Sequence, residues 1–104
     1  MTDYSIIMTT FPDKESAKHT ARILVEKQLA ACVQLFPIES VYSWQGEICN
    51  EGEVMLLIKS RTALFGEIVD AIKKNHTYEV PEIVQLPIAD GLPEYLKWIG
   101  DCTK

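Results

Sequence analysis

Residues 38–59 predict a β-hairpin that is long for a chain of 104 residues. Ile38–Trp44 alternates between apolar and polar residues, and Gln45–Gly46 is typical of a hairpin turn. Val54–Lys59 predicts a nearly continuous apolar strand, and Glu47–Glu53 extends it back to the turn. The two strands are longer than a four-stranded sheet over two short helices requires.

The distal half of this hairpin carries large apolar side chains that few residues of the same chain can cover. They are Val41, Tyr42, Trp44 and Ile48. Long apolar strand edges aggregate unless another strand or another chain covers them. The pattern therefore predicts an oligomer.

The elements before the hairpin are shorter. Tyr4–Thr9 predicts a first strand, and Asp13 is a suitable N-cap for an amphipathic helix from about Lys14 to Gln28. Ala31–Phe36 predicts a short buried strand that Pro37 closes.

Two helices and one strand follow the hairpin. Thr62 is a candidate cap for a second helix with an apolar stripe, Ile83–Ile88 predicts the fourth strand, and Pro93 suits the first turn of a last short helix. The stripe of the second helix comprises Phe65, Ile68, Val69 and Ile72, and the apolar face of the last comprises Leu92, Tyr95, Leu96 and Ile99. The order β-α-β-β-α-β with a terminal helix predicts a ferredoxin-like α+β sandwich, in one domain spanning residues 1–104.

Composition limits the partners. The net charge is −5 and the ten Lys and Arg residues are scattered, so we expect neither nucleic acid nor an anionic membrane surface as a partner. We expect no signal peptide and no membrane span, because no apolar run is long enough. With three cysteines and no CxxC motif, these features predict free thiols in a reducing cytoplasm.

The segment His76–Glu82 carries the densest group of functional side chains. It holds a histidine, a phenol and two carboxylates, and imidazole with carboxylates binds borderline metals. In a purely structural role, Tyr78 would pack at an interface, Pro81 would fix the entry to the fourth strand, and Glu82 would accept from a nearby donor. We expect Cys32 to be a small buried apolar residue. Cys49 and Cys102 have no visible partner, and exposed thiols there would bind soft metals.

Four short segments, in order and at matching spacing, resemble the CutA family of divalent-cation tolerance proteins. His76–Ile83 matches the family's His-x-Tyr-x-x-Pro-Glu segment. The other three are Val25–Val33, Ser40–Ile48 (with Glu53 and Lys59–Ser60 at the expected distances) and Tyr95–Ile99. The resemblance implies a ferredoxin-like subunit in a homotrimer built like the PII signalling proteins, in which long strands pair between subunits. It implies a response to copper or other divalent metals and no enzymatic activity.

The resemblance also implies candidate ligands. In one branch of the family, the copper ligands are a cysteine in the first strand and two adjacent histidines after the second helix. The corresponding residues here are Met8, Asn75 and His76, so one imidazole is kept, a thiolate becomes a thioether and an imidazole becomes an amide. Thioethers suit Cu(I), whereas amides are poor copper ligands.

Neighbouring subunits make an intersubunit cleft the expected ligand surface. Its predicted lining is Tyr78, Glu79, Glu82, Lys59 and Trp44. The alternative function is a PII-like small-molecule sensor or interaction module that binds an effector there, although a Gly-rich phosphate loop is missing. A metallochaperone is disfavoured because residues 8–12 contain no cysteine, and an acylphosphatase because they contain no glycine.

Overall fold

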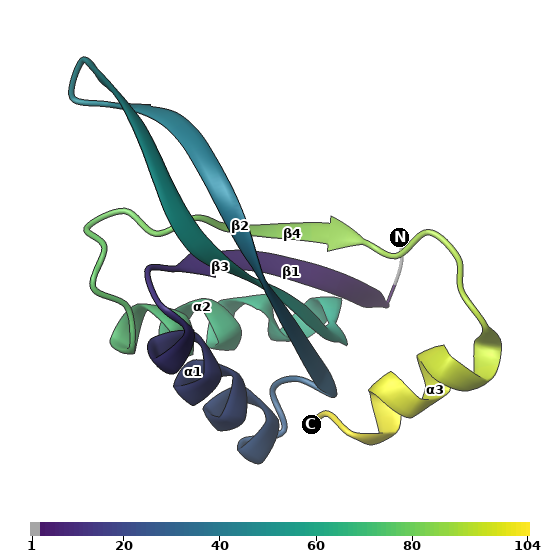
Figure 1. The fold of residues 1–104 in the computed structure, drawn as a ribbon. Helices are drawn as coiled ribbons and strands as arrows, with labels where there is room; N and C mark the ends of the chain where they lie inside the picture. The colour runs from purple at the N-terminus through teal and green to yellow at the C-terminus, as the bar shows by residue number, and fades with distance from the viewer. Residues whose placement is uncertain (1–2) are drawn as a thin grey trace.

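Helices α1 (Lys14–Glu26) and α2 (Phe65–Lys74) cover one face of a four-stranded antiparallel sheet in the computed structural model, which describes residues 3–104 (Figure 1). The strands are β1 (Tyr4–Phe11), β2 (Cys32–Trp44), β3 (Glu47–Arg61) and β4 (Ile83–Pro87), in the order β2-β3-β1-β4. A 3₁₀ turn, η1 (Thr62–Leu64), precedes α2, and α3 (Pro93–Asp101) closes the chain. This arrangement confirms the predicted ferredoxin-like fold. No helix among residues 3–104 has the length and apolarity needed to cross a membrane.

The core lies between the sheet and the two helices. Alternate residues of β1 and β3 point into it, and the stripes of α1 and α2 meet them, as the periodicities predict. The fully buried large side chains include Ile7, Phe11, Leu24, Leu56, Ile58, Ile68 and Ile72.

Helix α1 begins as predicted and ends earlier. The side chain of Asp13 accepts a 2.7 Å hydrogen bond from the backbone N–H of Ser16, which confirms the cap. The helix ends at Glu26 rather than Gln28, because Gln28 adopts a left-handed conformation with φ of 59°. The backbone N–H of Leu29 then donates to the carbonyl of Leu24 at 2.9 Å, a pattern that closes many helices.

Thr62 is not the cap of α2, so that prediction is wrong. Helix α2 starts at Phe65, after the 3₁₀ turn that contains Thr62. The Thr62 hydroxyl instead lies 2.6 Å from the hydroxyl of Ser5 on β1. A tertiary contact therefore takes the side chain away from the helix end.

Pro37 does not end a strand, which is a second correction. It lies inside β2 opposite Val54, and the β2–β3 pairing is continuous from Cys32 to Trp44. Strand β2 is an edge strand, where half of the backbone N–H groups face away from the sheet and proline is tolerated.

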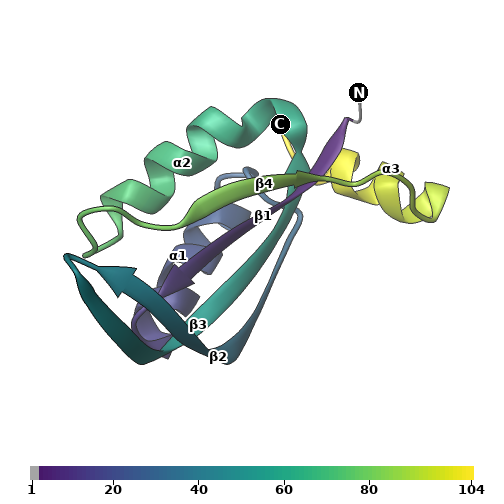
Figure 2. The same ribbon diagram turned by 90° about the horizontal axis from the view of Figure 1, so that it is seen from above.

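The β2–β3 hairpin projects well beyond the rest of the sheet (Figure 1). Seen from above, its tip lies by the loop between α2 and β4 (Figure 2). Its turn has positive φ at both Gln45 (50°) and Gly46 (80°), which matches the right-handed twist of the strands. The apolar side chains of its distal half are exposed: Val41 by 70%, Trp44 by 43% and Ile48 by 83%. The predicted surplus of uncovered apolar surface is therefore present in the subunit.

Neither α1 nor α2 covers the second face of the sheet, which we call the helix-free face although α3 touches one end of it at Lys59. Met8 alternates with buried Ile7 and pairs with Leu57 and Val84 on the two neighbouring strands, so these three share the helix-free face. By the same register this face carries Phe36, Met55 and Leu86. Phe36, Val84 and Leu86 are each nearly half exposed.

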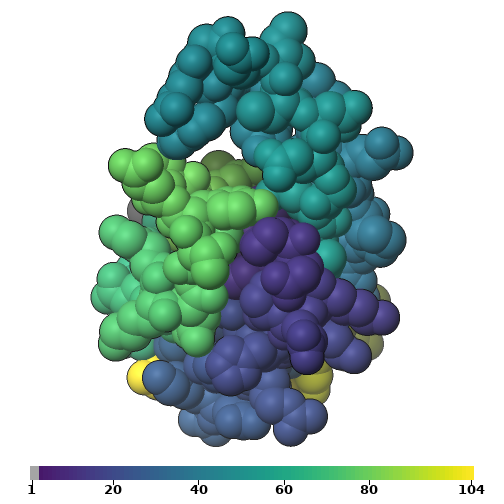
Figure 3. Space-filling model, turned by 60° about the vertical axis from the view of Figure 1, so that its left-hand side comes forward, coloured from purple at the N-terminus to yellow at the C-terminus, as the bar shows by residue number. Residues whose placement is uncertain are grey.

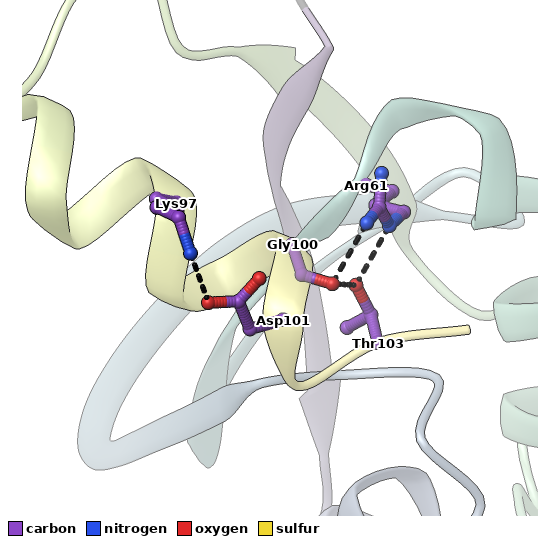
Figure 4. A network of polar contacts seen from close by, with 5 residues as sticks. All are labelled: Arg61, Lys97, Gly100, Asp101 and Thr103. Atoms are coloured by element: carbon purple, nitrogen blue, oxygen red, sulfur yellow. Dashed lines mark hydrogen bonds and ion pairs between the residues drawn. The ribbon is translucent and has the colours of Figure 1, made fainter.

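A clasp holds the C-terminal segment to the sheet (Figure 4). The guanidinium of Arg61, at the end of β3, donates to the carbonyl of Gly100 at 2.7 Å and to the hydroxyl of Thr103 at 3.1 Å. The backbone N–H of Lys104 donates to the carbonyl of Gln28 at 3.0 Å. The clasp therefore joins the end of α3 to both β3 and the turn after α1.

Candidate functional site

A cleft of about 740 Å³ lies between the distal hairpin and the segment 77–82. In Figure 3 the hairpin overhangs this segment and leaves a notch between them. Aromatic rings and carboxylates from both sides line it, chiefly Tyr42, Trp44, Glu51 and Glu53 from the hairpin, and Tyr78, Glu79 and Glu82 from the segment. The volume is in the range of small-molecule sites.

Two tyrosine–glutamate pairs organise the hairpin wall. The hydroxyl of Tyr78 donates to a carboxylate oxygen of Glu53 at 2.8 Å, and the hydroxyl of Tyr42 donates to Glu51. Burial and the bond to Glu53 raise the pKa of Tyr78 well above its ordinary value. The bond to Glu51 raises the pKa of Tyr42 to about 12. Both phenols therefore stay protonated donors near neutral pH, and neither offers a phenolate.

The cleft is acidic. Its described lining contains the carboxylates of Glu51, Glu53, Glu79 and Glu82, and no lysine, arginine or histidine. Glu53 is only 9% exposed, and it has no partner among the ion pairs of residues 3–104. The cleft therefore attracts cations.

His76 stands behind the cleft as a structural residue of this subunit. Its Nδ1 accepts from the backbone N–H of Tyr78 at 3.1 Å, so Nε2 carries the proton and donates to the carbonyl of Thr10 at 2.5 Å. Its ring stacks on Phe11 with centroids 4.3 Å apart and lies 4.6 Å from the ring of Tyr78. The imidazole fixes the segment 77–82 against the end of β1.

The model of the CutA1 divalent ion tolerance protein family matches residues 5–102. The chain belongs to the CutA1 divalent ion tolerance protein family. It is 44% identical over 99 residues to the divalent-cation tolerance protein CutA of Thermus thermophilus, covering 94% of this chain and 96% of that one.

Two further relatives show how far the similarity extends. A structure described as the periplasmic divalent cation tolerance protein CutA of Archaeoglobus fulgidus has a TM-score of 0.95 and 40% identity, covering 97% of this chain and 99% of that one. The chloroplastic CutA protein of Arabidopsis thaliana is 39% identical over 95% of this chain, which spans only 55% of that relative. The resemblance to the CutA family is thus confirmed for nearly the whole domain.

The three CutA-type candidate ligands come from β1 and from the end of α2. Met8 lies on the helix-free face, whereas Asn75 caps the C-terminus of α2 and donates its side-chain amide to the carbonyl of Ala71 at 2.8 Å. Both nitrogens of His76 are already hydrogen-bonded. Residues 3–104 contain no group of three or more His, Cys, Asp and Glu placed to hold a metal. Metal binding at Met8, Asn75 and His76 stays a prediction for the assembled protein.

Four of the five residues predicted for an intersubunit cleft lie together in this cleft of the single subunit: Tyr78, Glu79, Glu82 and Trp44. The intersubunit cleft itself stays a prediction. Lys59 does not line this cleft in the subunit, because its ammonium lies 5.3 Å from the ring centroid of Tyr95 on α3. Of the three cysteines, which are all free, only Cys49 lines the cleft. Cys32, predicted to be a small buried residue, is only half-buried in the subunit.

Sequence reasoning missed Glu53 and Glu51 as cleft residues of this CutA family member. They appear in the sequence as ordinary charges on a solvent-exposed strand. The sequence did contain a signal for these two residues, because residues two apart on a strand lie on the same face of the sheet. Glu51 and Glu53 therefore point the same way, and Tyr42 lies on the paired strand opposite Cys49, one step from Glu51 on that face.

Proposed function

We propose that this protein is a non-enzymatic homotrimer that acts in the cell's tolerance of divalent cations. Membership of the CutA1 family supports the tolerance function, since relatives are named for it. Absence of catalysis is supported by the cleft chemistry: its phenols are locked as donors, and His76 uses both nitrogens on backbone groups.

The observation that carries the proposed homotrimer is the apolar helix-free face. Monomeric proteins rarely expose a continuous apolar surface of this kind. The sheet also ends in two unlike edges, β2 and β4. A heterologous contact of one edge with the other on the next subunit closes into a ring when the rotation between successive subunits divides a full turn. Three subunits with their helix-free faces turned inward would cover Phe36, Val84 and Leu86 together.

The assembly is tested by mass in solution. Three chains of 11.8 kDa give about 35 kDa by light scattering. Val84→Glu on the helix-free face should dissociate the assembly. Val25→Glu is the matched control, because Val25 on α1 is equally exposed (44% against 45%) and lies on the other side of the sheet. A sharp peak near 12 kDa for the unmodified protein would overturn the trimer.

Direct copper binding is the narrower part of the proposal. For Cu(I) to reach the imidazole of His76, the ring must give up its bond to Thr10 or to Tyr78, and Met8 would add a thioether. Titration with copper of His76→Ala and of a variant lacking Cys32, Cys49 and Cys102 separates the ligands. Binding that is lost with the cysteines and kept in His76→Ala would move the site to the thiols.

A cytoplasmic location is also proposed, on the three free thiols, which are typical of a reducing compartment. Cell fractionation of the full-length protein tests it. Recovery from a periplasmic or organellar fraction would overturn it, and relatives described as periplasmic and chloroplastic make that comparison necessary.

A second candidate function is an effector sensor that uses the cleft. The specific observation in its favour is a cleft of about 740 Å³ walled by three aromatic side chains. A thermal-shift screen of metabolites in chelated buffer tests it. An intact trimer that no compound stabilises would remove this candidate and leave the tolerance function standing.

A further inference from the structure

We infer that the core binds one water molecule between the hydroxyl of Thr9 on β1 and the side-chain carbonyl of Gln85 on β4. The site lies inside the subunit, so it depends neither on the proposed trimer nor on metal binding. Two observations carry the inference: both polar atoms are buried without a partner, and the strand register places them close together.

Thr9 and Gln85 lie on the same face of the sheet. Ile7 is fully buried beneath the helices and pairs with Gln85, so the side chain of Gln85 also lies on the helix-covered face. Thr9 follows two residues along β1 on that face, opposite Ile83, which packs against the core. Thr9 and Gln85 are therefore diagonal neighbours on adjacent strands, with Cα atoms about 7–8 Å apart.

Both polar atoms are closed off from solvent. Thr9 is 0% exposed, and neither its Oγ1 nor Oε1 of Gln85 has a hydrogen-bond partner among residues 3–104. Such atoms are rare in folded proteins, because burial removes their hydrogen bonds to water without replacing them. A neighbouring subunit cannot supply the missing partner, since both atoms are already inaccessible in the single subunit. The partner must therefore lie inside the core.

Water matches the chemistry of the two atoms. It can accept a hydrogen bond from the hydroxyl of Thr9 and donate one to the carbonyl oxygen of Gln85. A direct bond is disfavoured, because the side chain of Thr9 is short and restricted in χ1. A bridging water adds two hydrogen bonds of about 2.8 Å each and spans the gap.

A larger or charged ligand fits this place poorly. Neither Thr9 nor Gln85 lines the cleft beside the hairpin, and a close-packed core leaves little space between side chains. An ion needs charged ligands, and the fully buried side chains of residues 3–104 include none. A single neutral molecule with both a donor and an acceptor is the best match.

The bridge ties an edge of the sheet to its centre. Strand β4 has five residues and pairs with one strand, β1. Gln85 is the middle residue of β4, so the water joins that strand to β1 through side chains as well as through the backbone ladder. Loss of the water should loosen β4 and leave the β2–β3 hairpin unchanged.

A high-resolution crystal structure tests the site directly. We expect a water oxygen about 2.7–3.2 Å from both Thr9 Oγ1 and Gln85 Oε1. Thr9→Ser keeps the hydroxyl and should keep the water, whereas Thr9→Val keeps the shape and should lose it. A direct hydrogen bond between Thr9 and Gln85, or a Gln85 side chain turned out to solvent, would overturn the inference.

Urea unfolding at fixed protein concentration gives an independent test. Thr9→Val and Gln85→Met should each raise the equilibrium constant of unfolding by about fivefold or more, because each leaves the water short of one partner. The double variant removes both polar atoms and should cost less than the sum of the two. Stabilisation by either single variant would show that the two atoms are simply unpartnered, and strictly additive losses would show that no molecule links them.

Thr20→Val is the matched control. Thr20 is also 0% exposed, but its hydroxyl donates to the carbonyl of Ser16 at 3.0 Å. Its effect should add to that of Gln85→Met without coupling, because the two side chains share no partner. Equal coupling of Gln85→Met with Thr20→Val and with Thr9→Val would overturn the inference, since it would indicate a general response of the core.

Discussion

The hydroxyl of Tyr78 reaches back 25 positions along the chain to the buried carboxylate of Glu53. This one bond joins the segment after α2 to the base of the projecting hairpin. It sets the width of the cleft, because each residue stands on one of its walls. Its strength can be measured separately from any ligand.

Replacing Tyr78 with phenylalanine should lower the free energy of unfolding by about 1–2 kcal/mol, because a buried carboxylate loses its donor. Urea unfolding at fixed protein concentration measures the change. Tyr42→Phe is the control: its hydrogen bond to Glu51 is exposed, so a smaller loss is expected. Equal losses in both variants would show that burial of Glu53 does not govern the effect.

Phenolate absorbance should show two tyrosines that ionise late, Tyr42 and Tyr78. Tyr42 should titrate near pH 12, and Tyr78 should also stay protonated well above the ordinary value of 10.0. Tyr42→Phe and Tyr78→Phe should each remove one late-titrating group. Ionisation of Tyr42 and Tyr78 near pH 10 would contradict these hydrogen bonds.

The free energy of unfolding should fall at high pH, because ionisation of Tyr78 breaks its bond to Glu53. The folded state raises the pKa of Tyr78, so its contribution is complete below the unfolded value of 10.0 and is lost as pH rises from there through the folded pKa. Unfolding midpoints between pH 9 and pH 11 should therefore decline more steeply for the unmodified protein than for Tyr78→Phe. Parallel slopes would show that the phenol is not the group responsible.

Replacing His76 with alanine should destabilise the protein by roughly 2–3 kcal/mol, since two hydrogen bonds and the stacking on Phe11 are lost. His19→Ala is the control, because His19 is exposed on α1 and should change stability by less than about 0.5 kcal/mol. Thermal unfolding under chelation measures both. A large loss that appears only when metal is added would assign His76 to a metal instead.

Two glycine-to-alanine substitutions should change the free energy of unfolding in opposite directions. A Cβ at Gly100 would lie 2.9 Å from the Tyr4 hydroxyl and 3.1 Å from the Arg61 guanidinium, so Gly100→Ala should disturb the clasp and destabilise by about 1–2 kcal/mol. Gly66 in α2 has open space around its Cβ position, so Gly66→Ala should stabilise by up to about 1 kcal/mol. Denaturant midpoints measure both changes. Similar losses at the two sites would mean that the close approach at Gly100 has no special effect.

Features fixed by local sequence were predictable. Asp13 caps α1 because its side chain serves a backbone group three residues away, and Gln45–Gly46 turns the hairpin through its own backbone preference. Features that depend on contacts between residues far apart in the sequence were not predictable. Thr62 is drawn to Ser5 on another strand, and Pro37 is tolerated only because β2 is an edge.

The candidate site also has a part that the sequence predicts and a part that it does not. His76–Glu82 was recognised because its functional groups are close together in the sequence. Glu53 was missed because its importance depends on Tyr78, which only the folded chain brings to it. The cleft is a tertiary feature, so a sequence pattern can indicate one wall but not the other.

The projecting hairpin and the core are under different structural constraints. Its distal residues pair with each other and lie outside the buried core that stabilises the subunit. Substitutions there should leave the packing beneath the helices undisturbed. The tip can therefore vary in sequence at little cost to the stability of the subunit, while the rest of the domain stays under constant structural constraint.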